Sequence, residues 1–456
     1  MNPSLPRFPS APAQTAALPL AETDSLRTLK RGIWAYILLL IFEGALRKWV
    51  LPGLAAPLLV IRDPLALWLV LATWRRGLLP ANGYLTAMTV VAIVAFFTAL
   101  LFGHRNLYVA VYGVRILLLH FPLMFVIGRL FNRADVERVG RVLLWISIPM
   151  TVLIALQFYS PQSAWVNRGV GGDMEGAGFS GALGFFRPPG TFSFTNGTTM
   201  FYSLLGCFVF YFWLAPRNTV SRLLLVAATG GLLASIPFSI SRTLLFQVII
   251  TLFFAMLAVS SRPRYLTRMI SALVGAVLVI AVLSQTSLLE APVEAFTTRI
   301  ELASDFEGGA KGTLVDRYLG SMLTAITGTK STQAPFFGYG IGMGTNVASN
   351  LLSGDRGFLI SEEEWGRLIG EMGLLMGLIV IVIRLGLMAK IALASYRQLA
   401  EGQLLPWLLV SFGLLTLPQG QWAQPTALGF SALLGGLMIA ALRPPAPVAG
   451  PKQPLR

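Results

Sequence analysis

Three consecutive carboxylates, Glu362, Glu363 and Glu364, stand directly before a long apolar stretch of the sequence. Arg367 and Glu371 follow within the first turns of that stretch. The spacing of Glu364, Arg367 and Glu371 puts all three on one face of a helix. Acidic residues suit a helix N-terminus, where the helix dipole favours negative charge, so capping is one interpretation. The other is a functional site, because ionisable groups at membrane depth are costly and usually functional.

Four arginines lie outside the long apolar stretches and are candidates for binding a diphosphate: Arg187, Arg242, Arg299 and Arg317. A guanidinium stays charged and binds phosphate oxygens through paired hydrogen bonds. Each arginine also has a simpler interpretation. Arg187 would snorkel from a loop, Arg242 in SISRT would be an interfacial anchor, and the other two would form weak surface ion pairs. With a diphosphate bound, one carboxylate at 362–364 would orient or deprotonate an acceptor hydroxyl group.

The segment RPPGTFSFTNGTTMF begins at Arg187, and its prolines and glycine predict an extended turn. Thr195 or Asn196 is expected to cap the helix that follows. Asn196, together with Arg367 and Glu371, is expected to support the site. Aromatic residues suited to stacking on sugar rings are Trp165, Phe185, Phe186, Phe336, Phe337, Tyr339 and Trp365. Arginines, a carboxylate and aromatics together fit a lipid-diphosphate sugar donor that meets a sugar acceptor.

Glycines recur in FFGYGIGMG, at positions 338, 340, 342 and 344. Glycine-rich loops can cradle phosphate, but this one lacks the following Lys–Ser/Thr pair of such loops. We therefore interpret it as a tight turn that returns the chain to the helix expected from 362.

A second group of charges lies at the ends of the first two apolar stretches. EGALRKW contains Glu43, Arg47 and Lys48, and IRDP contains Arg62 and Asp63. Charges within membrane spans usually pair with each other, so we expect these residues to hold the two spans together.

The composition indicates a polytopic membrane protein. The chain has 456 residues, of which 55% are hydrophobic and 12% are charged. Its net charge of +15 is explained by basic cytoplasmic loops, so no nucleic-acid partner is expected. With a single cysteine, Cys207, and two histidines, His104 and His120, we expect no disulfide, no metal site and no cofactor.

The fold class expected is an all-α integral membrane protein with about twelve transmembrane helices. The expected spans are 30–47, 55–73, 83–102, 107–129, 140–159, 196–215, 222–239, 243–260, 266–285, 362–389, 403–418 and 425–442. Basic residues fall in alternate connections, which predicts that both termini are cytoplasmic.

Five regions follow from these spans. Residues 1–28 are expected to be a disordered cytoplasmic tail, and 443–456 a second cytoplasmic tail. Between them, 29–285 would hold the first nine helices and a periplasmic loop at 160–195. Residues 286–361 would form a large periplasmic loop with short amphipathic helices, and 362–442 the last three helices.

Taken in order, RPPGTFSFTN, SISRT, Arg299, DRYLG, FGYGIGMG and an acidic pair leading into EMGLLMG resemble the O-antigen polymerase and ligase family. EGALRKW and IRDP look like a subgroup of exopolysaccharide polymerases. The resemblance implies a bacterial inner-membrane glycosyltransferase whose site faces the periplasm. Its donors would be undecaprenyl-diphosphate-linked oligosaccharides, without a nucleotide sugar or an essential metal. The lipid bilayer, a chain-length regulator and export machinery are further expected partners.

In that family, arginines at positions matching Arg187 and Arg242 are thought to hold the diphosphate. Its ligases carry a His–Asn type pair near the end of the large loop, and the matching positions before Gly373 hold Glu362 and Glu363. The missing histidine favours a polymerase. A ligase that transfers a finished glycan and a transporter of lipid-linked glycans remain the alternatives. Transporters are often built from related halves, and no repeat between 30–240 and 243–442 is evident.

Overall fold

The structure is a computed structural model that describes residues 24–79, 81–215, 219–260, 266–267, 269–271, 274–275, 287–307, 324–325, 327, 335–353, 359–361 and 363–443. The secondary structure in these ranges is almost entirely helical, as expected, with one short hairpin of β1 (Phe179–Ser180) and β2 (Phe186–Arg187). Most of the expected tails 1–28 and 443–456 and most of the expected span 266–285 lie outside the described residues. Residues 24–28 are helical, so the expected disorder is wrong for them.

Seven helices in the described part of the chain are long and apolar enough to cross a membrane. They are Pro52–Arg75, Gly83–Leu101, Leu107–Leu130, Arg133–Tyr159, Thr195–Leu214, Arg242–Ser260 and Glu364–Ala400. Shorter apolar helices are Arg222–Phe238, Leu404–Gln419 and Pro425–Ala441. Each of these overlaps a span expected from the sequence. The first helix, α1 (Asp24–Ala45), begins earlier than the expected position 30.

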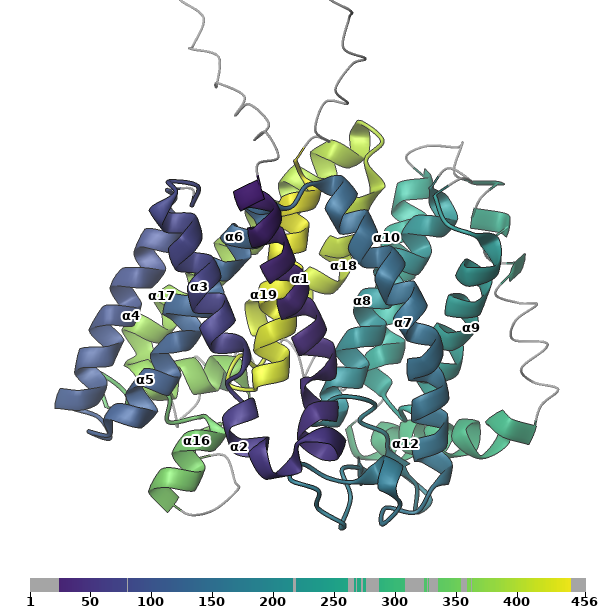
Figure 1. Cartoon of the computed structure of the whole chain (residues 1–456), viewed down its shortest axis with the longest axis horizontal. Coiled ribbons are helices and arrows are strands. Elements are labelled where there is room, and N and C mark those ends of the chain that lie inside the picture. The colour runs from purple at the N-terminus through teal and green to yellow at the C-terminus, as the bar shows by residue number, and fades with distance from the viewer. Residues whose placement is uncertain are drawn as a thin grey trace, which may run out of the picture.

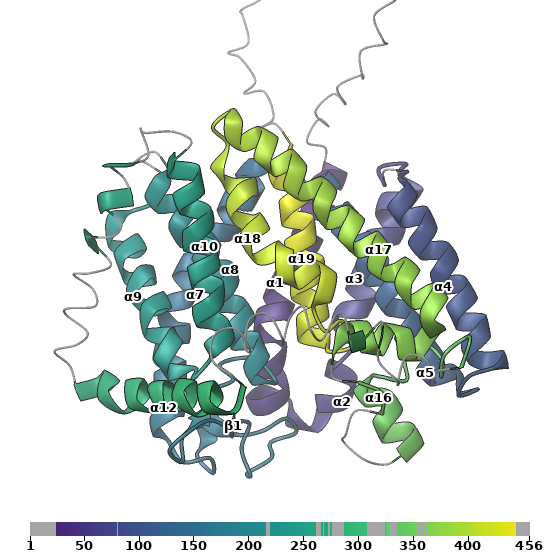
Figure 2. The same cartoon turned by 180° about the vertical axis from the view of Figure 1, so that it is seen from behind.

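Figure 1 shows that the helices after α1 form one bundle with it, and that α19 lies near the centre. They are α2 (Ala55–Leu58), α3 (Arg62–Arg75), α4 (Gly83–Leu101), α5 (Leu107–Arg115), α6 (Phe121–Leu130), α7 (Arg133–Tyr159), α8 (Thr195–Leu214), α9 (Arg222–Phe238), α10 (Arg242–Ser260), α12 (Glu290–Glu307), α16 (Asn346–Ala348), α17 (Glu364–Ala400), α18 (Leu404–Gln419) and α19 (Pro425–Ala441). Helix α19 contacts α1, α6, α8 and α18. Helices α3, α4 and α5 lie on one side of it and α7 to α10 on the other, while Figure 2 shows α17 behind, beside α4.

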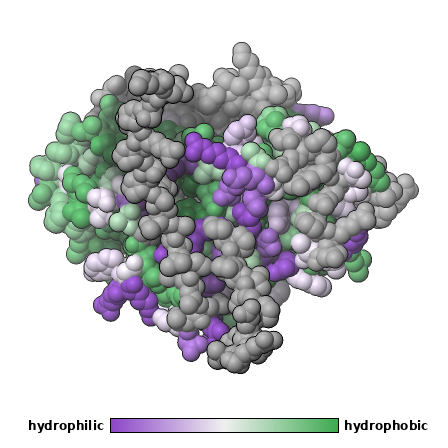
Figure 3. Space-filling view, turned by 90° about the horizontal axis from the view of Figure 1, so that it is seen from above, coloured by the Kyte–Doolittle hydropathy of each residue, from purple (hydrophilic) through white to green (hydrophobic). Residues whose placement is uncertain are grey.

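The bundle has two unlike ends. At one end, which we call the terminal end, α1 begins and α19 finishes. At the other, which we call the loop end, α2, α12, α16 and the hairpin lie. Seen from the terminal end, hydrophilic residues run across the middle and hydrophobic residues lie along parts of the rim (Figure 3). This distribution agrees with a bundle whose flanks face lipid.

Asparagine and serine side chains begin several helices. Asn82, Asn106 and Ser221 accept hydrogen bonds from the first turns of α4, α5 and α9. Asn132 forms a reciprocal capping box with Asp135 at the start of α7. The expected cap by Thr195 or Asn196 is wrong, because α8 already includes Thr195 and its preceding residue makes no side-chain cap.

Several of the described helices depart from regular α-helical geometry. π-helical turns, η1 (Leu46–Val50) and η3 (Ile116–His120), continue α1 and α5, and π-turns occur frequently at functional sites. Helix α17 is broken at Gly373, whose φ of 76° lies in the left-handed region. A Cβ at this position would lie 1.9 Å from the Phe336 carbonyl oxygen, so only glycine fits.

Of the long segment 286–361, the structure describes an expected amphipathic helix. This is α12, which packs against α9 through Ala295 and Phe296. Arg317 and most of the second expected helix lie outside the described residues.

Candidate functional site

The start of α17 carries a buried network of four charged side chains. Glu364 accepts hydrogen bonds from Arg367 at 2.8 and 3.0 Å and from Arg384 at 2.6 Å. Glu371 accepts from Arg367 at 2.6 Å, as the spacing of these residues predicted. All four side chains are at most 4% exposed, and their formal charges cancel. Paired charges of this kind are tolerated in an apolar interior.

The loop between α18 and α19 completes this network. Arg384 donates to the carbonyl oxygens of Leu417 and Gly420 at 2.7 and 3.0 Å, and its guanidinium lies 3.8 Å from the Trp422 ring centre. The backbone N–H of Trp422 donates to Glu364 Oε2 at 3.1 Å. Residues distant in the sequence thus fix the orientation of Glu364.

The glycine-rich turn closes over the same network. Gly338, Gly340 and Gly342 all have positive φ, and the N–H of Gly344 donates to Glu371 at 2.8 Å. A Cβ on Gly342 would lie 2.3 Å from the Val109 carbonyl oxygen. The interpretation as a tight turn that leads back to α17 is therefore confirmed, and glycine is needed because the turn packs directly on α5 and α17.

The three expected catalytic carboxylates differ in their surroundings. Glu364 is saturated by two guanidinium groups and a backbone N–H, which favours the charged form and holds it in place. Glu363 precedes α17, is exposed, and its backbone N–H donates to Ser361 Oγ at 3.1 Å. Glu362 lies outside the described residues. Glu364 lies in the first turn of α17, as expected of an acidic residue at a helix N-terminus, but no side chain caps the helix. Arg367 contacts both Glu364 and Glu371.

The charges of the first two spans form a second buried group. Glu43 accepts from Arg62 at 2.9 Å and from Arg47 at 3.4 Å, which confirms the expected pairing between the spans. Lys48 instead donates to the Gly190 carbonyl oxygen at 2.7 Å and is fully buried. Lys48 lies in η1, beyond the expected span 30–47, and burial lowers its pKa to about 7.

Asp63 has partners that the sequence analysis did not predict. Its carboxylate accepts from Arg115 at 2.5 Å and lies 3.0 Å from Nε2 of His120. The His120 Nδ1 lies 3.3 Å from the Tyr36 hydroxyl. His120 reaches this position from the π-helical turn η3. An ionisable residue inside an apolar stretch was the available signal for both Arg115 and His120.

The RPPGTFSFTN and EGALRKW segments dock on each other. Thr191 Oγ1 donates to the Ile41 carbonyl oxygen at 2.6 Å, and Arg47 donates to Ser193 Oγ at 3.0 Å. A Cβ on Gly44 would lie 2.3 Å from the Ser193 nitrogen, so glycine permits this contact. Two of the segments that carry the family resemblance therefore form one junction at the loop end.

The loop between α18 and α19 reaches this junction as well. Asn196 Nδ2 donates to Gln424 Oε1, and Arg62 donates to the Pro425 carbonyl oxygen at 2.8 Å. Three buried atoms around the loop, Arg62 Nη1, Asn196 Oδ1 and Trp422 Nε1, have no hydrogen-bond partner among the described residues. Buried groups of this kind normally bind water or a polar ligand. Asn196 thus belongs to the junction through its amide and not through capping.

Arg187, Arg242 and Arg299 converge on the hairpin and the turn between α9 and α10. Arg187 Nε donates to the Ser239 carbonyl oxygen at 3.4 Å, and Arg242 begins α10 three residues later. Arg299, on α12, donates to the carbonyl oxygen of Gly181 in the hairpin at 2.8 Å.

The turn that the arginines surround is strained. Ile240, between Ser239 and Arg242, has a φ of 46°, which is rare for a β-branched residue. Such strain concentrates at functional sites. The sequence from 176 to 289 also contains arginines but no aspartate or glutamate. Arg187 and Arg242 lie in this acid-free stretch, whereas Arg299 lies on α12, which also carries Glu290, Glu294 and Glu301.

The aromatic residues expected to stack on sugars fall into two groups. Phe185 stacks on Phe158, Phe337 stacks on Phe102, and Trp365 is buried with its indole N–H donating to the Pro418 carbonyl oxygen. The exposed ones are Trp165, Phe186, Phe336 and Tyr339. Only this second group presents a surface to a ligand.

Arg384 and Trp422 are the network residues that the sequence analysis missed. An arginine inside an apolar run was the signal for Arg384; nothing in the sequence marked Trp422. The residues that the structure describes contain no group of three or more His, Cys, Asp or Glu side chains able to hold a metal ion. No known family model matches this sequence, and no curated protein matches it.

Proposed function

We propose that the chain is a polymerase of the O-antigen or exopolysaccharide type, which joins undecaprenyl-diphosphate-linked repeat units. The observation that carries the proposal is that Arg187, Arg242 and Arg299, from three separate segments, lie at the hairpin and the strained turn next to it. Guanidinium groups bind diphosphate oxygens and stabilise the charge that grows on a leaving diphosphate.

In this proposal a hydroxyl group of one lipid-linked unit attacks the anomeric carbon of the growing chain. The bond from that carbon to the diphosphate oxygen breaks, and undecaprenyl diphosphate leaves with the negative charge. Arg187 and Arg242 bind that diphosphate, with Arg299 and Arg317 as helpers. The proton of the attacking hydroxyl group passes to a carboxylate.

Among the three glutamates, Glu363 is the proposed proton acceptor because it is exposed, whereas Glu364 is engaged by arginines. Glu362 is the alternative acceptor. In either case the network of Glu364, Arg367, Glu371 and Arg384 holds the segment that bears the acceptor in position.

The same proposal includes the topology. With about twelve spans and both termini in the cytoplasm, the loop end faces the periplasm of the bacterial inner membrane. Two observations support this orientation: α1 begins and α19 finishes at one end of the bundle, and the arginines and the hairpin lie at the other. A chain-length regulator or export machinery would then contact the loop end.

Reconstitution with purified lipid-linked repeat units tests the activity. We expect a ladder of longer glycans from the wild-type chain and none from Arg187→Ala or Arg242→Ala. Arg75→Ala serves as the control, since Arg75 is an exposed residue at the end of α3. Unchanged ladders in both site variants would remove these arginines from the mechanism.

A deletion strain distinguishes the polymerase from a ligase. The polymerase predicts that single repeat units accumulate on undecaprenyl diphosphate, as sized by mass spectrometry. Full-length chains on that lipid would identify a ligase instead.

One observation favours a second candidate, transport of the lipid-linked unit. Helix α17 is broken at Gly373 close to buried charges, and broken helices of this kind form binding sites in transporters. Movement of a labelled lipid-linked unit across proteoliposomes, with no change in glycan length, would establish this function and contradict the polymerase.

A further inference from the structure

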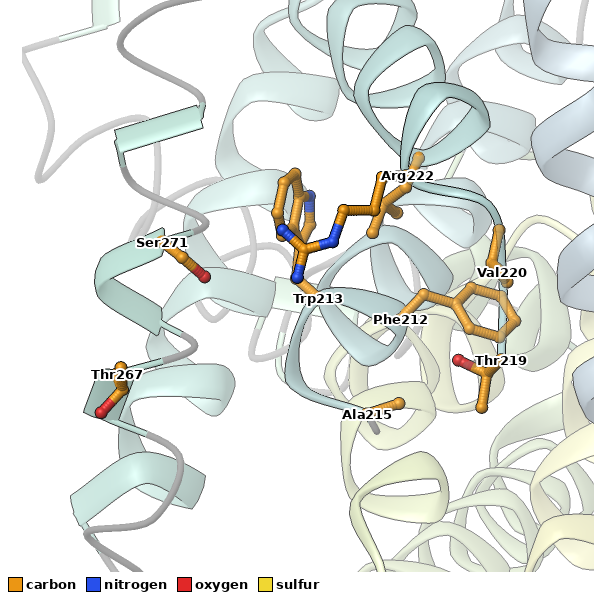
Figure 4. A pocket seen from close by; sticks show the side chains of 9 residues that line it. Phe212, Trp213, Ala215, Thr219, Val220, Arg222, Thr267 and Ser271 are labelled. Carbon is orange, nitrogen blue, oxygen red and sulfur yellow. The ribbon is translucent and has the colours of Figure 1, made fainter. Parts of the chain in front are cut away.

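A cavity of about 80 Å³ lies at the terminal end, where α8 finishes and α9 begins. Its lining includes Trp213, Thr219, Arg222, Thr267 and Ser271. Figure 4 shows the Arg222 side chain extending into the cavity toward Ser271, with the Trp213 indole beside it. Helix α8 is 20 residues long, so the cavity lies about 30 Å from the arginines of the hairpin.

The chemistry of this cavity favours an anion. Among the described residues, none forms a hydrogen bond or an ion pair with the guanidinium of Arg222. Thr219, Thr267 and Ser271 also line the cavity and make this part of its wall polar. The chain around the cavity belongs to the stretch from 176 to 289 that has no acidic residue. A phosphate group in the cavity therefore meets the charged guanidinium of Arg222, and no acidic side chain lines the cavity.

Apolar side chains flank the cavity on the outside of the bundle. Leu223, next to Arg222, is 82% exposed, and Leu266 and Ile270, next to Thr267 and Ser271, are each 52% exposed. In an apolar bundle, exposed leucine and isoleucine side chains of this kind face acyl chains. A polar cavity bordered by such residues at a helix end matches the boundary between headgroups and acyl chains.

We propose that this cavity binds the phosphate of an anionic membrane lipid, with its acyl chains along Leu223, Leu266 and Ile270. A free phosphate ion offers the same charge, but the apolar flank favours the lipid as its source. The site is independent of the proposed polymerase activity, since it lies at the opposite end of α8.

Native mass spectrometry of the delipidated full-length protein tests the proposal with phosphatidylglycerol, phosphatidylcholine and inorganic phosphate as probes. We expect Arg222→Gln to bind phosphatidylglycerol roughly tenfold more weakly than wild type. Ser271→Asp should weaken it too, because the added carboxylate repels the phosphate. Arg75→Gln, a change at another exposed arginine of this end, should bind like wild type.

Each outcome decides the assignment. Loss of phosphatidylglycerol in both cavity variants, with no such dependence for phosphatidylcholine, supports it. Equal binding of phosphatidylglycerol by all variants that elute as single species from size exclusion overturns it. Displacement of phosphatidylglycerol by millimolar inorganic phosphate would show a site for a soluble anion and would also overturn the lipid assignment.

Discussion

The loop end contains two groups of arginines that differ in burial and in their acidic neighbours. In the α17 network, Arg367 and Arg384 are buried with Glu364 and Glu371, and the formal charges cancel. Around the hairpin, Arg187, Arg242 and Arg299 are only partly buried, and the sequence from 176 to 289 supplies no acid. Arginine alone therefore does not identify an anion site.

The difference assigns separate tasks to the two groups. A neutral, saturated network has no capacity left for a ligand, and its removal should affect folding. The arginines around the hairpin are only partly buried and lie beside a strained turn, so their removal should affect activity. Substitutions in the α17 network should therefore change stability, and substitutions around the hairpin should change activity.

Glu364→Ala should produce the largest effect. It leaves Arg367 and Arg384 buried without their shared carboxylate, which costs about 3–5 kcal/mol of stability. Thermal unfolding of the purified protein measures the loss, and Glu363→Ala, at an exposed position, should unfold like wild type. If Glu364→Ala retains full stability, the network is not a structural unit.

Arg242→Ala should lower the rate of chain growth by about 10²–10³-fold, because a group that stabilises the leaving diphosphate is lost. Arg242→Lys should recover part of this rate, since it restores the charge without the paired hydrogen bonds. Single-turnover assays give the rates, and thermal unfolding of both variants should match wild type. A loss of stability as large as that of Glu364→Ala would erase the contrast between the two groups.

Gly342→Ala should destabilise the protein by about 1–3 kcal/mol. The new methyl group meets the Val109 carbonyl oxygen at 2.3 Å, and φ at this residue is 93°. Gly53→Ala is the matched control, because a Cβ there has no neighbour within 4 Å. Equal unfolding temperatures for the two variants would contradict the close packing of the turn on α5.

Lys48→Met tests the contrast least directly, through the pH dependence of stability. The folded pKa of Lys48 is lowered to about 7, so above that pH the unfolded chain binds the extra proton. The stability of the wild type relative to Lys48→Met should therefore rise from pH 7 to about pH 10, where the unfolded lysine also loses its proton. Parallel unfolding curves over this window would indicate a lysine with an ordinary pKa.

The sequence was sufficient for features that depend on neighbours along the chain. Apolar runs predicted the helices, and the spacing of Glu364, Arg367 and Glu371 predicted their shared face. The Glu43–Arg62 pair was predictable because both charges stand at adjacent span ends. In contrast, the partners of Asp63 and the contact of Arg384 with Trp422 depend on which distant helices pack together. Capping by Asn196 failed because α8 begins one residue earlier, and the amide instead donates to Gln424, 228 residues away.

The location of the Arg384 partners has a consequence for biosynthesis. Arg384 and Glu364 are synthesised before α18. The last turn of α18 and the loop after it nevertheless supply two carbonyl groups and a backbone N–H to these side chains. The broken helix α17 must therefore enter the membrane with these hydrogen bonds still unmade. The network is completed only when the last helical hairpin, α18 and α19, has been inserted. A ribosome that stalls before this hairpin would leave an assembly intermediate for membrane quality control to recognise.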